Sequence, residues 1–386
     1  MRFIKFLFIF FALFLSLACG NNSNGGKIKF SASGEVLAYA GYDFPPTSGA
    51  TGFVDGWQIE FSELLVTLDH LTLSENPDKN PNDQSQTDSI VAQLDGPWVI
   101  DLHPKGTLAG AGGGDETAIP FAELDKQNKN GNKPFDPTQR YAFGFDIVTA
   151  NMQAKNVNLS ASQLSNDYQY MISQGYTVYY VGTATWKGDD PANKNGCITQ
   201  DKGVYNFGQN IPRQINFKLG FKSPTTYINC QNGNADAAGF PGEEHQRGIA
   251  IKSNTTSIAQ VTIHTDHPFW QSVLHDSPAH FDMLGAHADQ NGAVTLEALK
   301  GVSYTHVTDV LGRDLPWRGC LSGWSFPDGG AIMHFDDQGI SGFADLYDFL
   351  TYNQSTQGHL NSDGLCFVKH NYPSSDYNPH TGSFGG

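Results

Sequence analysis

Positive charge is scarce in this chain. Its 386 residues contain 23 Lys and Arg against 39 Asp and Glu, a formal net charge of −16. Such a surface repels a phosphate backbone, so the sequence argues against a nucleic-acid partner. Charged residues make up only 16% of the chain, whereas glycine is frequent at 42 residues. This composition favours short strands joined by turns over long helices rich in Glu and Lys.

Long hydrophobic runs are missing beyond the N-terminus, where no stretch approaches the ~18 apolar residues of a transmembrane helix. The one dense apolar run spans residues 6–17 and follows Arg2 and Lys5. A positive start followed by a short apolar run is typical of an export signal.

The end of this run resembles the lipobox of bacterial lipoprotein precursors. In the sequence LSLACG at 15–20 a small residue precedes Cys19, while Ser16 and Leu17 depart from the usual pattern. The resemblance implies cleavage before Cys19 and a diacylglycerol on its thiol. Because Gly20 stands where Asp would retain such a lipoprotein in the inner membrane, it also implies an outer-membrane destination.

The expected mature protein is therefore a lipid-anchored protein of the bacterial cell envelope. We expect a signal peptide at 1–18 and the lipidated Cys19 with a flexible tether at 19–26. The expected partners are the lipid bilayer, through the acylated cysteine, and an envelope protein. An ordinary signal peptide cleaved elsewhere is the alternative, and it would leave Cys19 lost or unmodified.

Cysteine is also scarce. Apart from Cys19 the chain has four, which are Cys197, Cys230, Cys320 and Cys366. An even number in an exported protein predicts disulfides. No CxxC spacing is present, which argues against a redox motif or a zinc knuckle. Three pairings are possible, and local closure, Cys197–Cys230 with Cys320–Cys366, is the one we prefer.

Alternating apolar residues predict a mainly β fold. The alternation is clear within 52–73 and 176–186. The segments 90–94 and 98–102 flank the sequence Asp-Gly-Pro, which predicts a hairpin. A short helix is expected to start at Ser160 or Ser162.

The pattern changes after His264. Residues 268–300 carry apolar spacings of three and four, and 345–352 resembles a short helix. The predicted architecture is an antiparallel β-sandwich at 27–264 and a helical, loop-rich segment at 265–386 packed on it.

A histidine cluster is the strongest functional signal. The 24 residues from 264 to 287 hold five of the 13 histidines of the chain, interleaved with aspartates. Imidazoles from a strand end, a turn and short helices can converge on one ion, and carboxylates can ligate it or orient the rings. The predicted metal ligands are His264, His267, His275, His280, His287 and Asp266.

Imidazole ligands favour Zn or Cu over hard cations, and paired cysteines would leave no thiolate. We therefore expect a Zn or Cu ion as cofactor and a role in metal capture or delivery. A non-catalytic module binding glycan or an envelope protein, with structural histidines, is the alternative. A metal-dependent hydrolase is the third possibility, and it would need a carboxylate base such as Asp266 or Glu244. Whether the chain is an enzyme stays open, with a non-enzyme preferred.

A second resemblance lies in the first predicted strands. The sequences GWQIEF at 56–61 and LLVTL at 64–68 resemble the opening strands of methanobactin-associated periplasmic copper-binding proteins. The resemblance implies a β-rich exported fold more than it implies copper.

Overall fold

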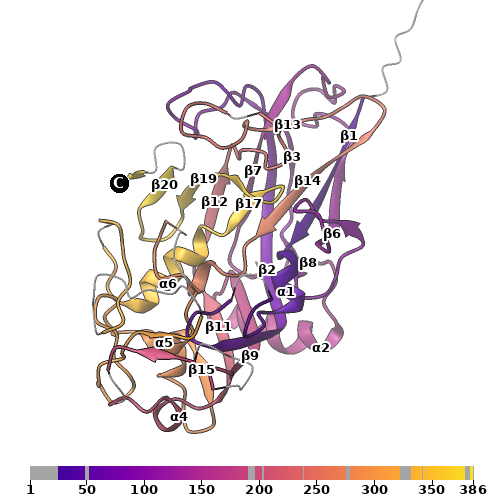
Figure 1. Cartoon of the computed structure of the whole chain (residues 1–386). Helices are drawn as coiled ribbons and strands as arrows, with labels where there is room; N and C mark the ends of the chain where they lie inside the picture. The colour runs from indigo at the N-terminus through magenta and orange to yellow at the C-terminus, as the bar shows by residue number, and fades with distance from the viewer. Residues whose placement is uncertain are drawn as a thin grey trace, which may run out of the picture.

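Two β-sheets dominate the computed structural model of the chain (Figure 1). The structure describes residues 25–47, 52–189, 196–201, 204–237, 239–274, 279–321, 332–340, 342–378 and 383–385. The expected signal peptide, Cys19 and most of the tether lie outside these residues. The prediction of a mainly β fold with short helices is confirmed.

The smaller sheet combines strands from both ends of the chain. Its strands, in spatial order, are β18 (Gly364–Leu365), β17 (Gly358–Leu360), β14 (Thr256–Ile263), β1 (Lys27–Ser33), β6 (Thr117–Leu124) and β5 (Leu108–Ala109). All neighbours are antiparallel except β1 and β14, which are parallel.

The larger sheet is built around one long strand, β2. Its main path is β15 (Ala293–Thr295), β11 (Gln214–Phe221), β9 (Val178–Trp186), β2 (Trp57–Ser74), β7 (Arg140–Ile147), β12 (Thr225–Ile228), β19 (Phe367–His370), β20 (Asp376–Asn378) and β21 (Ser383–Gly385). Three further strands pair with this path, β3 (Ile90–Leu94), β4 (Trp98–Asp101) and β13 (Ile249–Ala250), and β8 (Lys155–Asn156) pairs with β4. Residues after 264 thus contribute strands to both sheets.

The two sheets pack face to face through aromatic and aliphatic side chains. Phe30 of β1 stacks on Phe143 of β7 with ring centroids 6.0 Å apart, and one buried apolar cluster includes residues of both sheets. The alternation that predicts the strands is the cause, because every second side chain of a strand points to the same face.

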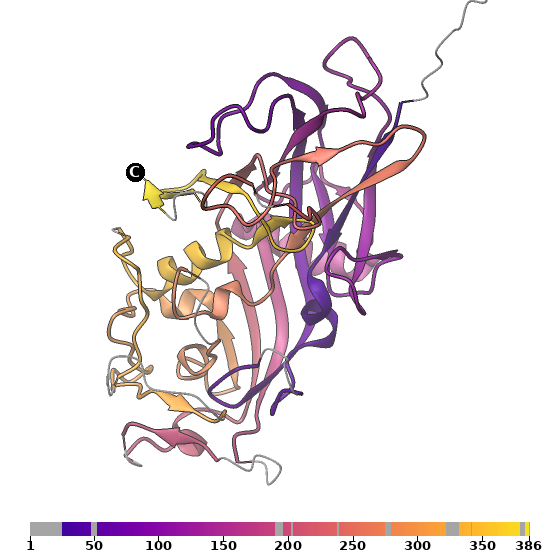
Figure 2. The same cartoon turned by 45° about the horizontal axis from the view of Figure 1, so that its top comes forward.

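The helices are short and lie mostly outside the sheets. They are α1 (Glu35–Ala40), α2 (Ala161–Gln163), the π-helical turn η1 (Leu164–Tyr168), α3 (Gln169–Gln174), α4 (Phe207–Asn210), the 3₁₀ turns η2 (His267–Phe269) and η3 (Leu296–Leu299), α5 (Asp282–Gly285) and α6 (Leu346–Ser355). Figure 2 shows the orange and yellow C-terminal helical segments on one side of the long central strands. Among the described residues, no helix is long and apolar enough to cross a bilayer.

One predicted helix boundary is confirmed and one predicted hairpin is wrong. Ser160 caps α2 in a capping box with Gln163, and Gly175 ends α3 in the left-handed region. The segments β3 and β4 do not pair with each other. Both pair with β2, at Leu71–Ser74 and Leu65–Leu68, because this 18-residue strand is long enough to hold them end to end.

The preferred disulfide pairing is also wrong. The bonds are Cys197–Cys320 and Cys230–Cys366. Pairing of β10 (Ile198–Thr199) with β16 (Arg318–Gly319) places the first two cysteines together, and pairing of β12 with β19 does the same for the others. Strand pairing between distant segments, rather than proximity along the chain, therefore decides the connectivity.

Cys230→Ala/Cys366→Ala is expected to lower the free energy of unfolding by about 3–5 kcal/mol. The bond joins cysteines 136 residues apart, and closing so long a loop restricts the unfolded chain strongly. Urea denaturation measures the loss. Peptide mapping without reduction checks the connectivity, and a peptide linking Cys197 to Cys230 would contradict it.

Candidate metal centre

The candidate site lies where β14 ends beside β17. In this antiparallel pair Thr262 is opposite His359, and His264 follows the last residue of β14. Side chains two positions apart along a strand point to the same face, so His264 and His359 become diagonal neighbours. Their rings stack with centroids 4.1 Å apart and planes 19° apart.

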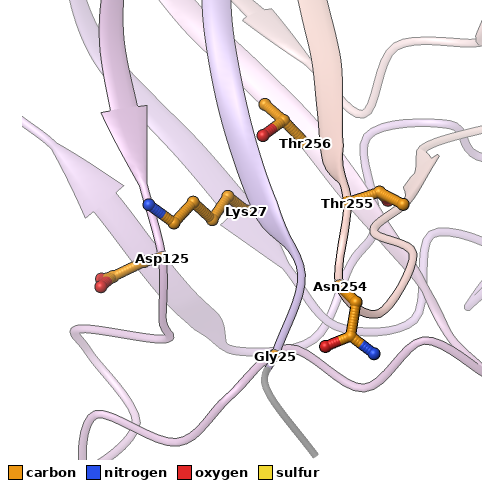
Figure 3. Close-up of a pocket in the computed structure, with 6 residues that line it drawn as sticks. All are labelled: Gly25, Lys27, Asp125, Asn254, Thr255 and Thr256. Atoms are coloured by element: carbon orange, nitrogen blue, oxygen red, sulfur yellow. The ribbon is translucent and has the colours of Figure 1, made fainter.

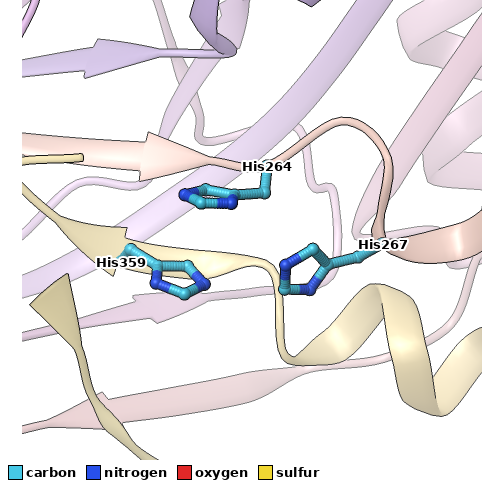
Figure 4. A group of neighbouring side chains, drawn as sticks. All are labelled: His264, His267 and His359. Atoms are coloured by element: carbon cyan, nitrogen blue, oxygen red, sulfur yellow. The ribbon is translucent and has the colours of Figure 1, made fainter. Parts of the chain in front are cut away.

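A tight turn brings the third imidazole. The 3₁₀ turn η2 starts at His267, directly after Asp266, with Pro268 as its second residue, and it places His267 near the strand end. The ring centroid of His267 lies 5.3 Å from that of His264 and 5.5 Å from that of His359. Figure 4 shows the three rings facing a common space, and one ring nitrogen of each lies within 4.8 Å of the others. We call these three residues the histidine triad.

A hydrogen bond orients one ring of the triad. The Thr356 hydroxyl donates to the carbonyl oxygen of Asn353 at 2.8 Å and lies 3.1 Å from Nδ1 of His267. Since this hydroxyl has one proton, it accepts the second bond, and His267 carries its proton on Nδ1. Nε2 then carries the lone pair that can bind a metal ion.

Burial distinguishes the members of the triad. His267 and His359 are only 1% and 3% exposed, whereas the His264 side chain is 14% exposed. The open side of the site is therefore at His264.

Carboxylates surround this open side. Glu35 Oε1 and Asp363 Oδ1 lie 3.7 and 3.9 Å from Nε2 of His264. Burial, with Glu116 and Asp363 nearby, raises the pKa of Glu35 to about 8. Burial also raises the pKa of Asp266 to about 6, against the opposing effect of His264. A carboxyl group whose pKa is raised in this way indicates a site that lacks positive charge.

The other predicted ligands are not brought into the triad. His275 lies outside the described residues. His280 is fully buried elsewhere, with Nε2 2.9 Å from Oε1 of Gln271 and its ring against Trp317. His287 Nε2 is 2.7 Å from the carbonyl oxygen of Thr308. Asp266 lies beside the triad but is not among the groups whose ligand atoms converge.

Sequence reasoning missed His359. It lies 95 positions after His264, beyond the local window that revealed the cluster. The sequence shows His359 only as a polar residue in the short strand Gly358–Leu360. Its position beside His264 follows from strand pairing, which the sequence does not reveal.

A second group of possible ligands lies on the larger sheet. Asp69, His70 and Asp95 bring ligand atoms within 4.8 Å, and Nδ1 of His70 is 2.9 Å from Asp146 Oδ2. The His70 side chain is 49% exposed. Water would therefore compete with these side chains for a bound ion more strongly than it would at the buried triad.

A wide hollow lies far from the triad. Figure 3 shows the six residues around it, at the end of the fold where the chain enters β1. Thr256 in its wall begins β14, whereas His264 follows the end of that strand. Its lining is Gly25, Lys27, Asp125, Asn254, Thr255 and Thr256, without a set of converging metal ligands.

Exposed tryptophans in a common plane would favour the glycan-binding alternative, since a sugar ring stacks on them. Among the described residues Trp57, Trp98 and Trp317 are buried, and Trp186 and Trp270 are partly buried. The described part of the chain therefore offers no exposed tryptophan platform for a sugar ring.

Comparison with protein-family models, with curated proteins and with solved structures finds no match. We therefore infer function from the chemistry of the site.

His280→Gln is expected to make the free energy of unfolding less dependent on pH below neutrality. Burial, with Arg318 nearby, lowers the pKa of His280 from its ordinary value of about 6.5 to about 3. Between these values the unfolded chain takes up a proton that the folded chain does not. The free energy of unfolding therefore falls as the pH drops through this window, and Gln lacks this proton.

Urea denaturation at about pH 7 and about pH 4 measures this effect. The free energy of unfolding of the original chain should fall more between these two pH values than that of the variant, so the difference between them should be smaller at about pH 4. A histidine resonance assigned to His280 that titrates near its ordinary pKa would contradict the explanation.

Proposed function

We propose that this chain is a metal-binding lipoprotein of the bacterial cell envelope that captures a Zn or Cu ion or delivers it to a partner. The observation that carries the proposal is the histidine triad, because ligand atoms from three separate positions converge within 4.8 Å. Neutral imidazoles in this number are typical ligands of Zn and Cu.

The four later cysteines and the methionine of the sequence cluster are not available as metal ligands. All four cysteines outside the N-terminal segment form disulfides, so they supply no thiolate. Met283, which lies within the sequence cluster, is fully buried in the apolar core. This leaves a nitrogen site, which favours Zn(II) or Cu(II) over Cu(I) bound by thioethers.

Three protein ligands leave a coordination position for water, a carboxylate or a partner's ligand. An incomplete coordination shell suits a protein that must also release its ion. The two disulfides agree with an oxidising compartment, which supports export.

Metal-dependent hydrolysis is a second candidate because of Asp266. This side chain is only 8% exposed, its Oδ1 has no hydrogen-bond partner, and its raised pKa suits a general base near neutral pH. Hydrolysis of an activated ester by the Zn-loaded protein, lost in Asp266→Asn while the metal stays bound, would favour this candidate over simple binding.

His267→Ala/His359→Ala is expected to abolish metal binding, since it removes two of the three nitrogens. The measurement is metal content by inductively coupled plasma mass spectrometry, on residues 20–386 exported to an oxidising compartment. We expect about one Zn or Cu per chain in the original protein and less than about a tenth of that in the variant.

The control is His245→Ala/His306→Ala, which removes two histidines outside the triad. It should keep the original metal content. The proposed function would be refuted if the triad variant held as much metal as the original protein. It would also be refuted if neither the original protein nor the variants bound metal after incubation with Zn(II) and Cu(II).

Cys19→Ser is expected to release the protein from the membrane fraction. Serine has no thiol to acylate, so the variant loses the acyl chains that hold the protein on the bilayer. Labelling of cells with radioactive palmitate, followed by fractionation, measures both effects. Label retained by the variant would show that Cys19 is not the lipidated residue.

A further inference from the structure

A second set of ligand atoms shares one residue with the triad. Glu35, His264 and Asp363 also bring one ligand atom each within 4.8 Å of the others. We call Glu35, His264 and Asp363 the outer group. His264 belongs to both sets, and its Nε2 is the atom nearest both carboxylates.

Exposure decreases from the outer group to the triad. The side chains of Asp363, Glu35 and His264 are 69%, 22% and 14% exposed. The two remaining triad residues are almost completely buried. An ion arriving from solvent therefore meets the outer group before it reaches the buried imidazoles.

The surroundings of the outer group are acidic and lack compensating cations. Glu116 and Asp266 lie close enough to interact electrostatically with Glu35. Among the described residues, no Lys or Arg forms an ion pair with any of these four carboxylates. Asp266 adds a separate indication of a missing cation, because its Oδ1 is buried without a hydrogen-bond partner.

The backbone holds both outer carboxylates in place. Glu35 has a φ of 61°, and its N–H donates to the Ser33 hydroxyl at 2.9 Å. Asp363 follows a turn in which Ser362 has a φ of 69° and donates its N–H to Thr262 Oγ1 at 2.9 Å. A left-handed backbone is costly for residues other than glycine, and here two such positions flank the same imidazole.

We propose that the outer group is the entry position for the metal ion and that His264 passes the ion from Glu35 and Asp363 to His267 and His359. This inference rests on the proposed function and adds the route by which the buried triad is filled. Imidazole nitrogens suit Zn and Cu better than carboxylate oxygens do, so the ion moves on from the outer carboxylates to the buried triad. No bond other than metal–ligand bonds forms or breaks in this step.

Stopped-flow mixing of the metal-free protein with Zn(II) tests the route. The variant is Glu35→Gln/Asp363→Asn, and the readout is the uptake rate followed with a fluorescent zinc indicator. We expect the rate to fall at least about tenfold, the lower end of rate gains from focused charge. Zinc content at equilibrium should stay at the original value, because the triad is intact.

Glu60→Gln/Asp125→Asn is the matched control. It makes the same two kinds of replacement, Glu to Gln and Asp to Asn, at exposed positions, and Asp125 lies at the opposite end of β6 from Glu116. Its uptake rate should remain close to the original. The single variant Asp363→Asn, at the most exposed position, provides a test if the double variant folds poorly, and it should also slow uptake.

The failures of the two proposals are distinguishable. Uptake as fast in the outer-group variants as in the control would overturn the entry route while leaving metal binding intact. Loss of one bound ion per chain at equilibrium would also overturn it, since the outer group would then be a resident site. A triad variant that still binds metal would instead refute the proposed function.

Discussion

The antiparallel pairing of β14 with β17 is the constraint on which the candidate site depends. It places His359 opposite Thr262 and so beside His264, although the two histidines are 95 positions apart in the chain. A slip of one residue would turn His359 to the other face of the sheet, because side chains alternate along a strand. The convergence of the histidine triad is therefore a consequence of strand register.

The rest of the structure supports this register. β14 is held on its other side by β1, whose Phe30 packs against the larger sheet. The end of α6 supplies Thr356, which orients His267. The Cys230–Cys366 bond ties β12 to the chain just before β19, soon after β17 and β18. Side chains held this way, on a smaller sheet packed against the larger one, would need little reordering to bind an ion, which would favour affinity.

The sequence predicted the fold class and two residues of the candidate site for physical reasons. Alternation in β2 and β9 is a local pattern, and it correctly indicated a half-buried sheet. His264 and His267 are close in sequence, and a strand end followed by a proline-containing turn brings them together. His280 and His287 shared the same local density but pack into other parts of the fold.

What the sequence could not predict depends on long-range pairing. The two disulfides join segments 123 and 136 positions apart, and local closure was the wrong guide. The third imidazole and Asp363 arrive with strands from the C-terminal segment, and neither belongs to a local motif. Loop-closure cost rises only slowly with length, so distance along the chain is a weak argument against contact.

The most direct test of the account is a crystal structure of the Zn- or Cu-loaded protein with anomalous diffraction at the metal edge. We expect one strong peak about 2.0–2.1 Å from a nitrogen of His264, of His267 and of His359. A loaded crystal with no anomalous peak at the triad, or with its only ion at another position, would contradict it.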